Sequence, residues 1–252
     1  AVLVTRRPLT RDGALVATPH VGGPGHNTHE AIDRATLGLI EVRSQIWRDV
    51  VWINVSGDAP AFENAMAPVM ARWADFEQPV FHGGADSAFA LDVATNWKLA
   101  VENYCESYHL PWVHPGLNAY SRLEDHYNIE GPAFSGQGTE VYRQLSDENG
   151  DTFPDFKGLP AKWDTAAEYI AVYPNVLLGV HRDHAFAIVL VPEGPEKTVE
   201  HIHLYYPQPG TSSGLRQRNT QLWKTVFEED IFVVEGMQKG RHATGFDGGR
   251  FS

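Results

Sequence analysis

The segment that decides the fold reads Glu102-Asn103-Tyr104-Cys105-Glu106-Ser107-Tyr108-His109-Leu110-Pro111-Trp112-Val113-His114-Pro115. A helix through its first half would place Glu106 and His109, three residues apart, on one face, so that a carboxylate stands beside an imidazole. Pro111 would disturb this helix, and the chain could then turn to present His114 to the same point. The spacing therefore predicts two histidines that can meet at one metal ion.

A third ligand would have to come from elsewhere in the chain. Two histidines and one carboxylate form the facial triad of mononuclear non-haem iron(II) sites, which leaves metal positions open for O₂ and water. The other interpretation is that both histidines are partly buried and bind local carbonyl groups.

The C-terminal part of the chain offers two carboxylates for this role. Asp230 lies three residues after Phe227 and four before Val234, on the apolar face of a helical pattern, whereas Glu229 falls between that face and solvent. A buried lone carboxylate is costly unless it is paired or metal-bound. An ion pair with a nearby Arg or Lys remains the alternative explanation for Asp230.

Patterns on either side of this segment predict an α+β fold. Apolar residues at helical spacing indicate one helix from residue 62 to about 76, packed on a sheet, and a long amphipathic helix from about 213 to 240. Near the N-terminus, β-branched and aromatic runs predict strands at 37–42 and 46–55, separated by residues 43–45. Four further strand-like runs predict an antiparallel meander, at 169–173, 176–181, 185–191 and 198–206.

Composition excludes several classes of protein. The 252 residues contain 20 Lys and Arg against 32 Asp and Glu, a net charge of −12, which disfavours a nucleic-acid-binding surface. The single cysteine excludes a disulfide framework within these residues. No apolar run reaches the roughly 18 residues of a membrane helix, and the N-terminus does not read as a signal peptide. We expect a cytoplasmic protein with no membrane or nucleic-acid partner.

The motif as a whole closely resembles one enzyme family. Asn96-Trp97-Lys98, then Glu102-Asn103, then Glu106-x2-His109-x4-His114-Pro115 is similar to the catalytic domain of the α subunit of Rieske-type non-haem iron oxygenases, the aromatic ring-hydroxylating dioxygenases. Tyr173-Pro174-Asn175, Arg182-Asp183-His184 and the segment 228–238 extend the likeness, which runs from about Asp12 to the C-terminus.

The resemblance implies a fold, a cofactor and partners. It implies a helix-grip (Bet v 1/START-like) domain, an antiparallel sheet around a long C-terminal helix. His109, His114 and Asp230 would bind mononuclear Fe(II), Glu106 would bridge to the electron-donating cluster of a neighbouring subunit, and Asn103 would sit close to the iron. The implied partners are a small-molecule substrate, O₂, a reductase or ferredoxin donor, and two further copies in a homotrimer.

The chain also departs from the family pattern. The family's Rieske [2Fe–2S] cluster needs two Cys and two His, and the only cysteine among these residues is Cys105, so this chain alone cannot bind it. If Asp12-Gly13 matches the Asp-Gly after the second half-motif, cluster positions fall near Val2 and Thr5. We therefore interpret residues 1–35 as the remnant of a Rieske-domain region and 36–252 as the catalytic mononuclear-iron domain. Truncation is favoured over a borrowed electron donor or a loss of turnover.

Three functions are compatible with such a chain to different degrees. The first is an oxygenase that hydroxylates an aromatic or quaternary-ammonium small molecule; Glu106 and Asn103 resemble the group that oxidises glycine betaine, carnitine or choline. The second, a zinc hydrolase, is disfavoured because the histidine spacing is not His-Glu-x-x-His. The third is a non-catalytic helix-grip domain that binds a hydrophobic ligand and has lost the electron path.

Overall fold

The computed structural model describes residues 9–248, which form two compact units, residues up to Pro60 and residues from Ala61 onward. The positions near Val2 and Thr5 lie outside the described residues. The predicted boundary at residue 35 concerns ancestry and stays a prediction.

The first unit contains one short helical turn and one hairpin. The turn is η1 (Arg34–Thr36), and the hairpin pairs β1 (Arg43–Trp47) with β2 (Val50–Asn54). The predicted strand positions are wrong in this unit, because residues 43–45 belong to a strand and residues 37–42 do not. The turn falls at Arg48 and Asp49, whose φ angles are +54° and +60°. Two-residue hairpin turns need positive φ, and this local requirement overrode the apolar pattern.

The second unit is built on an eight-stranded antiparallel sheet. Its strand order is β3-β10-β9-β8-β7-β6-β5, and β4 pairs with β10 beside β3. The predicted meander is confirmed as β7 to β10, each paired with the next. The strands are β3 (Phe81–His82), β4 (Ala88–Val93), β5 (His126–Gly131), β6 (Phe134–Thr139), β7 (Ala167–Val172), β8 (Val176–Val180), β9 (Ala185–Gly194) and β10 (Lys197–Tyr206).

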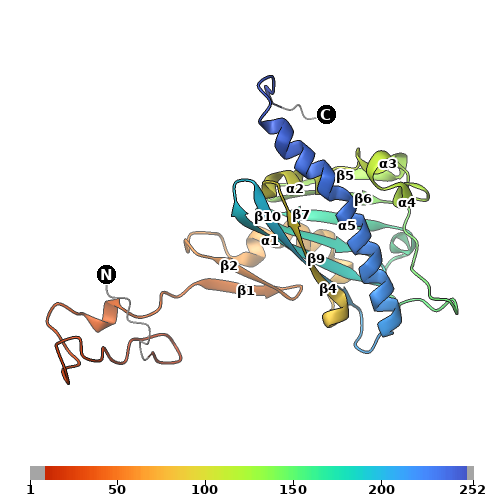
Figure 1. The fold of residues 1–252 in the computed structure, drawn as a ribbon. Coiled ribbons are helices and arrows are strands. Elements are labelled where there is room, and N and C mark those ends of the chain that lie inside the picture. Colours follow the sequence, from red (N-terminus) through yellow and green to blue (C-terminus); the bar gives the residue numbers. More distant parts are fainter. Residues whose placement is uncertain (1–8, 249–252) are drawn as a thin grey trace. The chain divides into compact units, whose positions relative to one another are not determined.

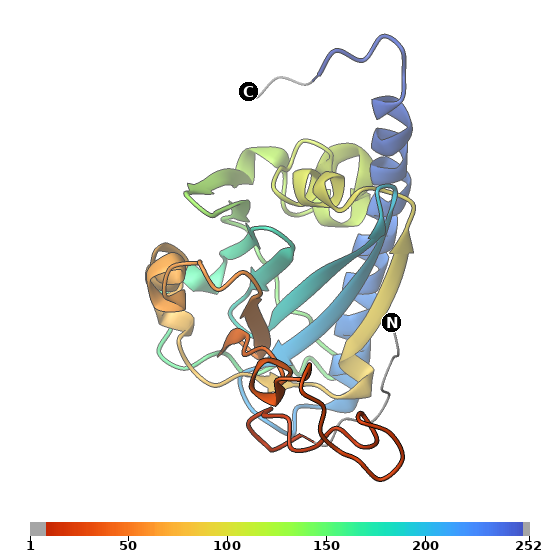
Figure 2. The ribbon, with the colours of Figure 1, turned by 90° about the vertical axis from the view of Figure 1, so that its left-hand side faces the viewer.

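Helices cover both faces of this sheet. The long helix α5 (Ser213–Arg241) lies across one face, and α1 (Phe62–Arg72) lies on the opposite side (Figures 1 and 2). The alternation of side chains along β7 explains the two faces, because Tyr169 points toward Trp223 of α5 while Glu168 points toward α1. The expected α+β fold with a long C-terminal helix is confirmed.

The predicted packing of α1 on the sheet is also confirmed. Met66 and Val69 are buried, and Trp73 and Phe76, just after the helix in and around η2 (Ala74–Phe76), are almost completely buried. The ring of Phe76 lies edge-on to Trp163 at a centroid distance of 4.6 Å. Trp163 belongs to η5 (Ala161–Asp164), so this face of the sheet has its own aromatic cluster.

The helix expected to carry both Glu106 and His109 ends before either residue. It is α2 (Trp97–Tyr104), with the side chain of Asn96 accepting a hydrogen bond from the backbone N–H of Lys98 at 3.1 Å. Two single-turn helices follow, α3 (Leu110–Val113) and α4 (Pro115–Asn118). Proline suits the first turn of a helix, where its missing N–H is not needed, so Pro111 begins a new turn rather than ending the old one.

Two more helical turns complete the second unit, η3 (Ala85–Ser87) and η4 (Leu123–Asp125). Among the helices of residues 9–248, none combines the length and the apolar character needed to cross a bilayer.

Glu168 joins α1 to the sheet through a buried ion pair. Its carboxylate accepts two hydrogen bonds from the guanidinium of Arg72, at 2.8 and 2.9 Å, one from the indole N–H of Trp73 at 2.7 Å and one from the hydroxyl of Tyr127 at 2.9 Å. Both carboxylate oxygens of Glu168 thus accept hydrogen bonds from side chains on this face, and these bonds hold α1 against the sheet.

We expect Glu168→Ala to lower the free energy of unfolding by about 3 kcal/mol, because it removes a buried carboxylate that accepts four hydrogen bonds. Chemical denaturation measures this loss. The control is Glu193→Ala, which removes an exposed pair with Lys197 and should cost less than about 1 kcal/mol. Equal losses in the two variants would contradict the anchoring role.

Candidate metal centre

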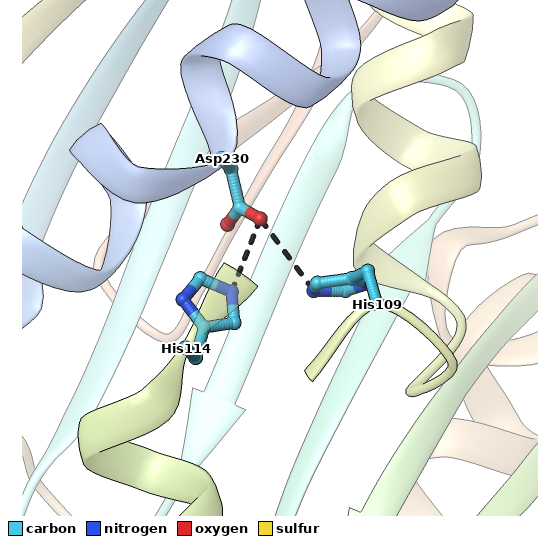
Figure 3. Close-up of side chains that lie close together, drawn as sticks. All are labelled: His109, His114 and Asp230. Atoms are coloured by element: carbon cyan, nitrogen blue, oxygen red, sulfur yellow. Dashed lines mark ion pairs between the residues drawn. The ribbon is translucent and has the colours of Figure 1, made fainter. Parts of the chain in front are cut away.

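The structure brings His109, His114 and Asp230 together (Figure 3). One potential ligand atom from each residue lies within 4.8 Å of the others. Oδ1 of Asp230 is 3.5 Å from Nε2 of His109 and 3.1 Å from Nε2 of His114. The three side chains come from the loop after α2, from the α3–α4 junction and from α5, so residues more than 100 positions apart meet at one point.

The short helix α3 sets the separation of the two histidines. His109 immediately precedes α3 and His114 immediately follows it, with the backbone N–H of His114 donating to the carbonyl of Leu110 at 3.0 Å. The two rings are 5.1 Å apart between centroids and inclined by 75°. One helical turn therefore brings both Nε2 atoms to the same carboxylate.

Each imidazole is held from behind by its own glutamate. Oε1 of Glu106 lies 2.6 Å from Nδ1 of His109, and Oε2 of Glu229 lies 2.8 Å from Nδ1 of His114. An ionised carboxylate can only accept, so each Nδ1 carries a proton and each Nε2 is the ring nitrogen that faces Asp230. This is the arrangement that orients histidine ligands and raises their basicity.

This geometry corrects one sequence expectation and adds one residue to the site. Glu106 and His109 do not share a helix, because α2 ends at Tyr104; the carboxylate of Glu106 instead folds back in a turn and also accepts the N–H of Tyr108. The sequence places Glu229 between the apolar face and solvent. Its side chain, which is longer than that of Asp230, nevertheless reaches Nδ1 of His114. The sequence signal for this role is the position of Glu229, directly beside Asp230 on a helix with one apolar face.

Asn103 completes the contacts of Asp230. Its Nδ2 donates to Oδ1 of Asp230 at 3.0 Å, and its own Oδ1 is buried with no hydrogen-bond partner among residues 9–248. All five residues expected at the site, Asn103, Glu106, His109, His114 and Asp230, therefore lie together in the structure.

Excess negative charge shifts the protonation of His114. Burial opposes the charged form, but hydrogen bonds and charges from Asp230 and then Glu229 outweigh it, so the pKa of His114 lies above its usual value. A site that attracts a proton onto a ligand nitrogen equally favours a metal cation there.

The donor set fits a divalent iron ion. Two imidazole nitrogens and one carboxylate oxygen are the protein ligands of a facial triad. Ligands about 2.1 Å from one ion and at right angles are roughly 3 Å apart, close to the 3.1 and 3.5 Å separations between the nitrogens and Asp230.

A cavity opens directly from this cluster. It contains about 640 Å³ of space free of protein atoms, part of it open to solvent. Ser121, His126 and Gln137 form a hydrogen-bonded polar strip on its wall. The rest of the wall is largely aromatic and comprises Tyr104, Tyr120, Tyr142, Tyr169, Phe186, Trp223 and Phe227.

A second, smaller hollow also reaches Asp230 and contains Glu200 of β10. Glu200 shares a face of the strand with Ile202 and Leu204, so its carboxyl group points into the core beneath α5. Burial, reinforced by the charge of Asp230, raises the pKa of Glu200 to about 7. The alternation along β10 could have revealed this inward acid from the sequence.

Comparison with known proteins bears on this site. Residues 70–252 match the family described as ring hydroxylating alpha subunit, catalytic domain. The chain belongs to this family. The α subunits of these oxygenases use a mononuclear non-haem iron together with a Rieske [2Fe–2S] cluster, and they work with a small-molecule substrate, O₂ and a reductase or ferredoxin donor.

The individual relatives of this chain are distant. It is 22% identical over 228 residues to the carnitine monooxygenase oxygenase subunit of Acinetobacter pittii (strain PHEA-2), covering 87% of this chain and 57% of that protein. It is 28% identical over 201 residues to putrescine 2-hydroxylase of Bordetella bronchiseptica (strain ATCC BAA-588 / NCTC 13252 / RB50), covering 71% and 43%. The chain thus spans about half the length of these relatives.

The fold is shared with solved structures. One is a quaternary ammonium Rieske monooxygenase, with a TM-score of 0.72 at 18% identity, covering 98% of this chain and 63% of the other. At 18% identity, this similarity shows that the fold is shared and nothing more.

Glu200→Gln tests the charge balance around Asp230. A carboxyl whose pKa rises from 4.5 to about 7 on folding stabilises the fold while protonated and loses that contribution as pH rises between those values. In metal-free protein we therefore expect wild type and Glu200→Gln to be equally stable at pH 4.5, and the variant to be more stable at pH 8 by about 1 to 3 kcal/mol.

Denaturant titrations at the two pH values measure the difference. Glu140→Gln, at an exposed position, is the control and should change stability by less than about 0.5 kcal/mol at either pH. A Glu200→Gln effect that does not depend on pH would refute the raised pKa.

Proposed function

We propose that this chain is the catalytic part of a non-haem iron oxygenase that hydroxylates an aromatic or quaternary-ammonium small molecule, using O₂ and electrons from a Rieske and reductase donor. The observation that carries the proposal is the meeting of His109, His114 and Asp230 at the end of an aromatic cavity. We assign the unit a helix-grip fold, with residues 36–252 as the iron domain and residues 1–35 as a Rieske-region remnant.

Fe(II) would be held by Nε2 of His109, Nε2 of His114 and the carboxylate of Asp230. Iron bound there supplies the reductive activation of O₂ that this class of oxygenase requires. Glu106 and Glu229 orient the two imidazoles, and the amide of Asn103 fixes the carboxylate of Asp230. The aromatic wall excludes water from the reacting centre.

Glu106 is also the proposed entry point for electrons. Its side chain is one-third exposed, so one carboxylate both binds His109 and reaches the surface. Tyr108 and Trp112, beside it in the chain, are 54% and 80% exposed, which offers a flat aromatic surface to a donor. Inter-subunit electron transfer is attributed to the similar quaternary ammonium monooxygenase. We propose a homotrimer for this protein because its motif resembles the α subunits of this family.

The residues of this chain do not fit a Rieske cluster. Such a centre needs two cysteines and two histidines, and Cys105 is the only cysteine in these 252 residues. The cysteine ligands of a Rieske donor must therefore belong to another polypeptide segment, from which electrons would reach Glu106.

Anaerobic reconstitution with Fe(II) followed by metal analysis tests the ligand set. We expect about one iron per wild-type chain and almost none in His109→Ala or Asp230→Ala, since either change removes one of three protein ligands. His126→Ala is the matched control, because His126 lines the same cavity but has both ring nitrogens engaged, by Ser121 and Gln137. If wild type bound no iron, or if all variants bound the same amount of iron, the proposed ligand set would be wrong.

Glu106→Gln and Glu229→Gln form a matched pair that separates ligand orientation from electron entry. Both weaken the hold on one imidazole, so iron affinity should fall by roughly tenfold or more in each. At saturating iron, only Glu106→Gln should slow oxidation of a separately supplied, reduced Rieske protein, by about tenfold or more. Stopped-flow absorbance of the donor measures this rate, and equal rates in the two variants would refute electron entry through Glu106.

A further inference from the structure

The cavity wall carries no side chain suited to an anionic substrate. Among the residues described as lining it, none is Lys or Arg, and the only acid is Asp230 at the metal end. The remaining wall is mainly aromatic, and aromatic faces attract cations through their negative quadrupole. The polarity of the wall alone thus admits neutral or positively charged molecules.

A buried polar network lies behind this wall and ends on Asp183. The hydroxyl of Tyr142 donates to Oδ1 of Asp183 at 2.9 Å, and the indole N–H of Trp223 donates to Nε2 of His184 at 2.8 Å. Because that nitrogen accepts, the proton of His184 must be on Nδ1, which lies 2.8 Å from the same Oδ1 of Asp183. Two cavity-lining rings are therefore hydrogen-bonded, one directly and one through His184, to a single carboxylate.

No positive charge within the network offsets Asp183. Its side chain is 0% exposed, and its Oδ2 has no hydrogen-bond partner among residues 9–248. His184 is neutral in this arrangement, and burial, followed by the neighbouring His184, lowers the pKa of His181, which stacks on His184 at 4.1 Å. The adjacent Arg182 lies outside this network: it feels the charge of Asp183, but its guanidinium contacts Asp155 at 2.5 Å and Asp164 at 3.5 Å, and these two carboxylates contribute more to its raised pKa.

This arrangement makes the aromatic wall more attractive to a cation. Burial and the charge of Asp183 raise the pKa of Tyr142, so its hydroxyl stays protonated and keeps donating. A phenol that donates to a carboxylate gains electron density in its ring, and an indole that donates to a histidine gains it to a lesser degree. Buried negative charge without a cation is costly, so a cation against the cavity face of these rings is favoured.

We propose that Asp183 is a specificity-determining positioning residue, which holds and polarises Tyr142 and Trp223 so that the cavity selects a small organic cation over a neutral molecule of the same shape. This inference rests on the proposed function, since it takes the cavity beside Asp230 as the substrate site. It narrows the substrate class to ammonium compounds and assigns their recognition to groups in the turn between β8 and β9, on α5 and in the segment after β6.

The test compares choline with its neutral isostere 3,3-dimethylbutan-1-ol. Binding of each to the metal-free chain is measured by titration calorimetry. We expect wild type to bind choline at least tenfold more tightly than the isostere. Asp183→Asn keeps the shape and an acceptor oxygen but removes the charge, so choline affinity should fall about tenfold while affinity for the isostere stays within twofold.

Tyr142→Phe is the second variant, and it decides the matter if Asp183→Asn does not fold. It keeps the ring and removes the hydroxyl that contacts Asp183, so choline affinity should fall about threefold with the isostere unaffected. A parallel loss for both compounds would show a merely structural role. Equal binding of the two compounds by wild type, or no binding of choline, would overturn the inference.

The outcome is independent of the iron measurement. A chain that binds iron at His109 and Asp230 but does not prefer choline keeps the oxygenase proposal and refutes cation selection by Asp183. A chain that prefers choline but binds no iron refutes the oxygenase proposal alone.

Discussion

The structure of the site depends on how α5 packs against the sheet. Trp223, Phe227 and Val234 lie along one stripe of this helix and are buried. Asp230 lies in the same stripe, so the packing that buries the apolar side chains also draws a carboxylate partly out of solvent. A partly buried carboxylate is costly unless it has partners, and Asn103, His109 and His114 are the groups that meet it. The loop after α2 is folded to satisfy this one requirement.

The contacts around the two imidazoles leave an excess of negative charge. Three carboxylates, from Glu106, Glu229 and Asp230, surround two histidines, each of which carries at most one positive charge. Protonation of His114 partly relieves the excess, and a divalent cation would relieve it more fully because it contacts all three ligands at once. The raised pKa of Glu200 in the neighbouring hollow is a second sign of the same field.

The cavity joins two regions with different tasks. At one end, polar groups from three separate elements converge on one point, which suits the binding of a metal ion. Along the wall, Tyr142 and Trp223 line the cavity and donate their polar hydrogens to Asp183 and His184. Under the two proposals, reactivity depends on Asp230 of α5 and recognition on Asp183, in the turn between β8 and β9.

Much of the site could be predicted from the sequence because it depends on local spacing. The stripe of Phe227 and Val234 identified Asp230 as inward-facing, and the distances between Glu106, His109 and His114 along the chain bring them to one point whether the segment is a helix or a turn. Alternating apolar residues likewise predicted the meander β7 to β10. These features can be predicted because an element that buries one face carries apolar residues with a period of 3.6 in a helix or 2 in a strand.

Other features were decided only by the tertiary structure. The turn at Arg48 and Asp49 depends on backbone angles that the apolar pattern does not encode. Glu229 reaches His114 across 115 positions, and Asp183 receives hydrogen bonds that originate in two separate elements. Periodicity states which face of an element a side chain occupies, but not which distant side chain it meets. That depends on the relative placement of whole helices and strands, which the summed packing of the core determines.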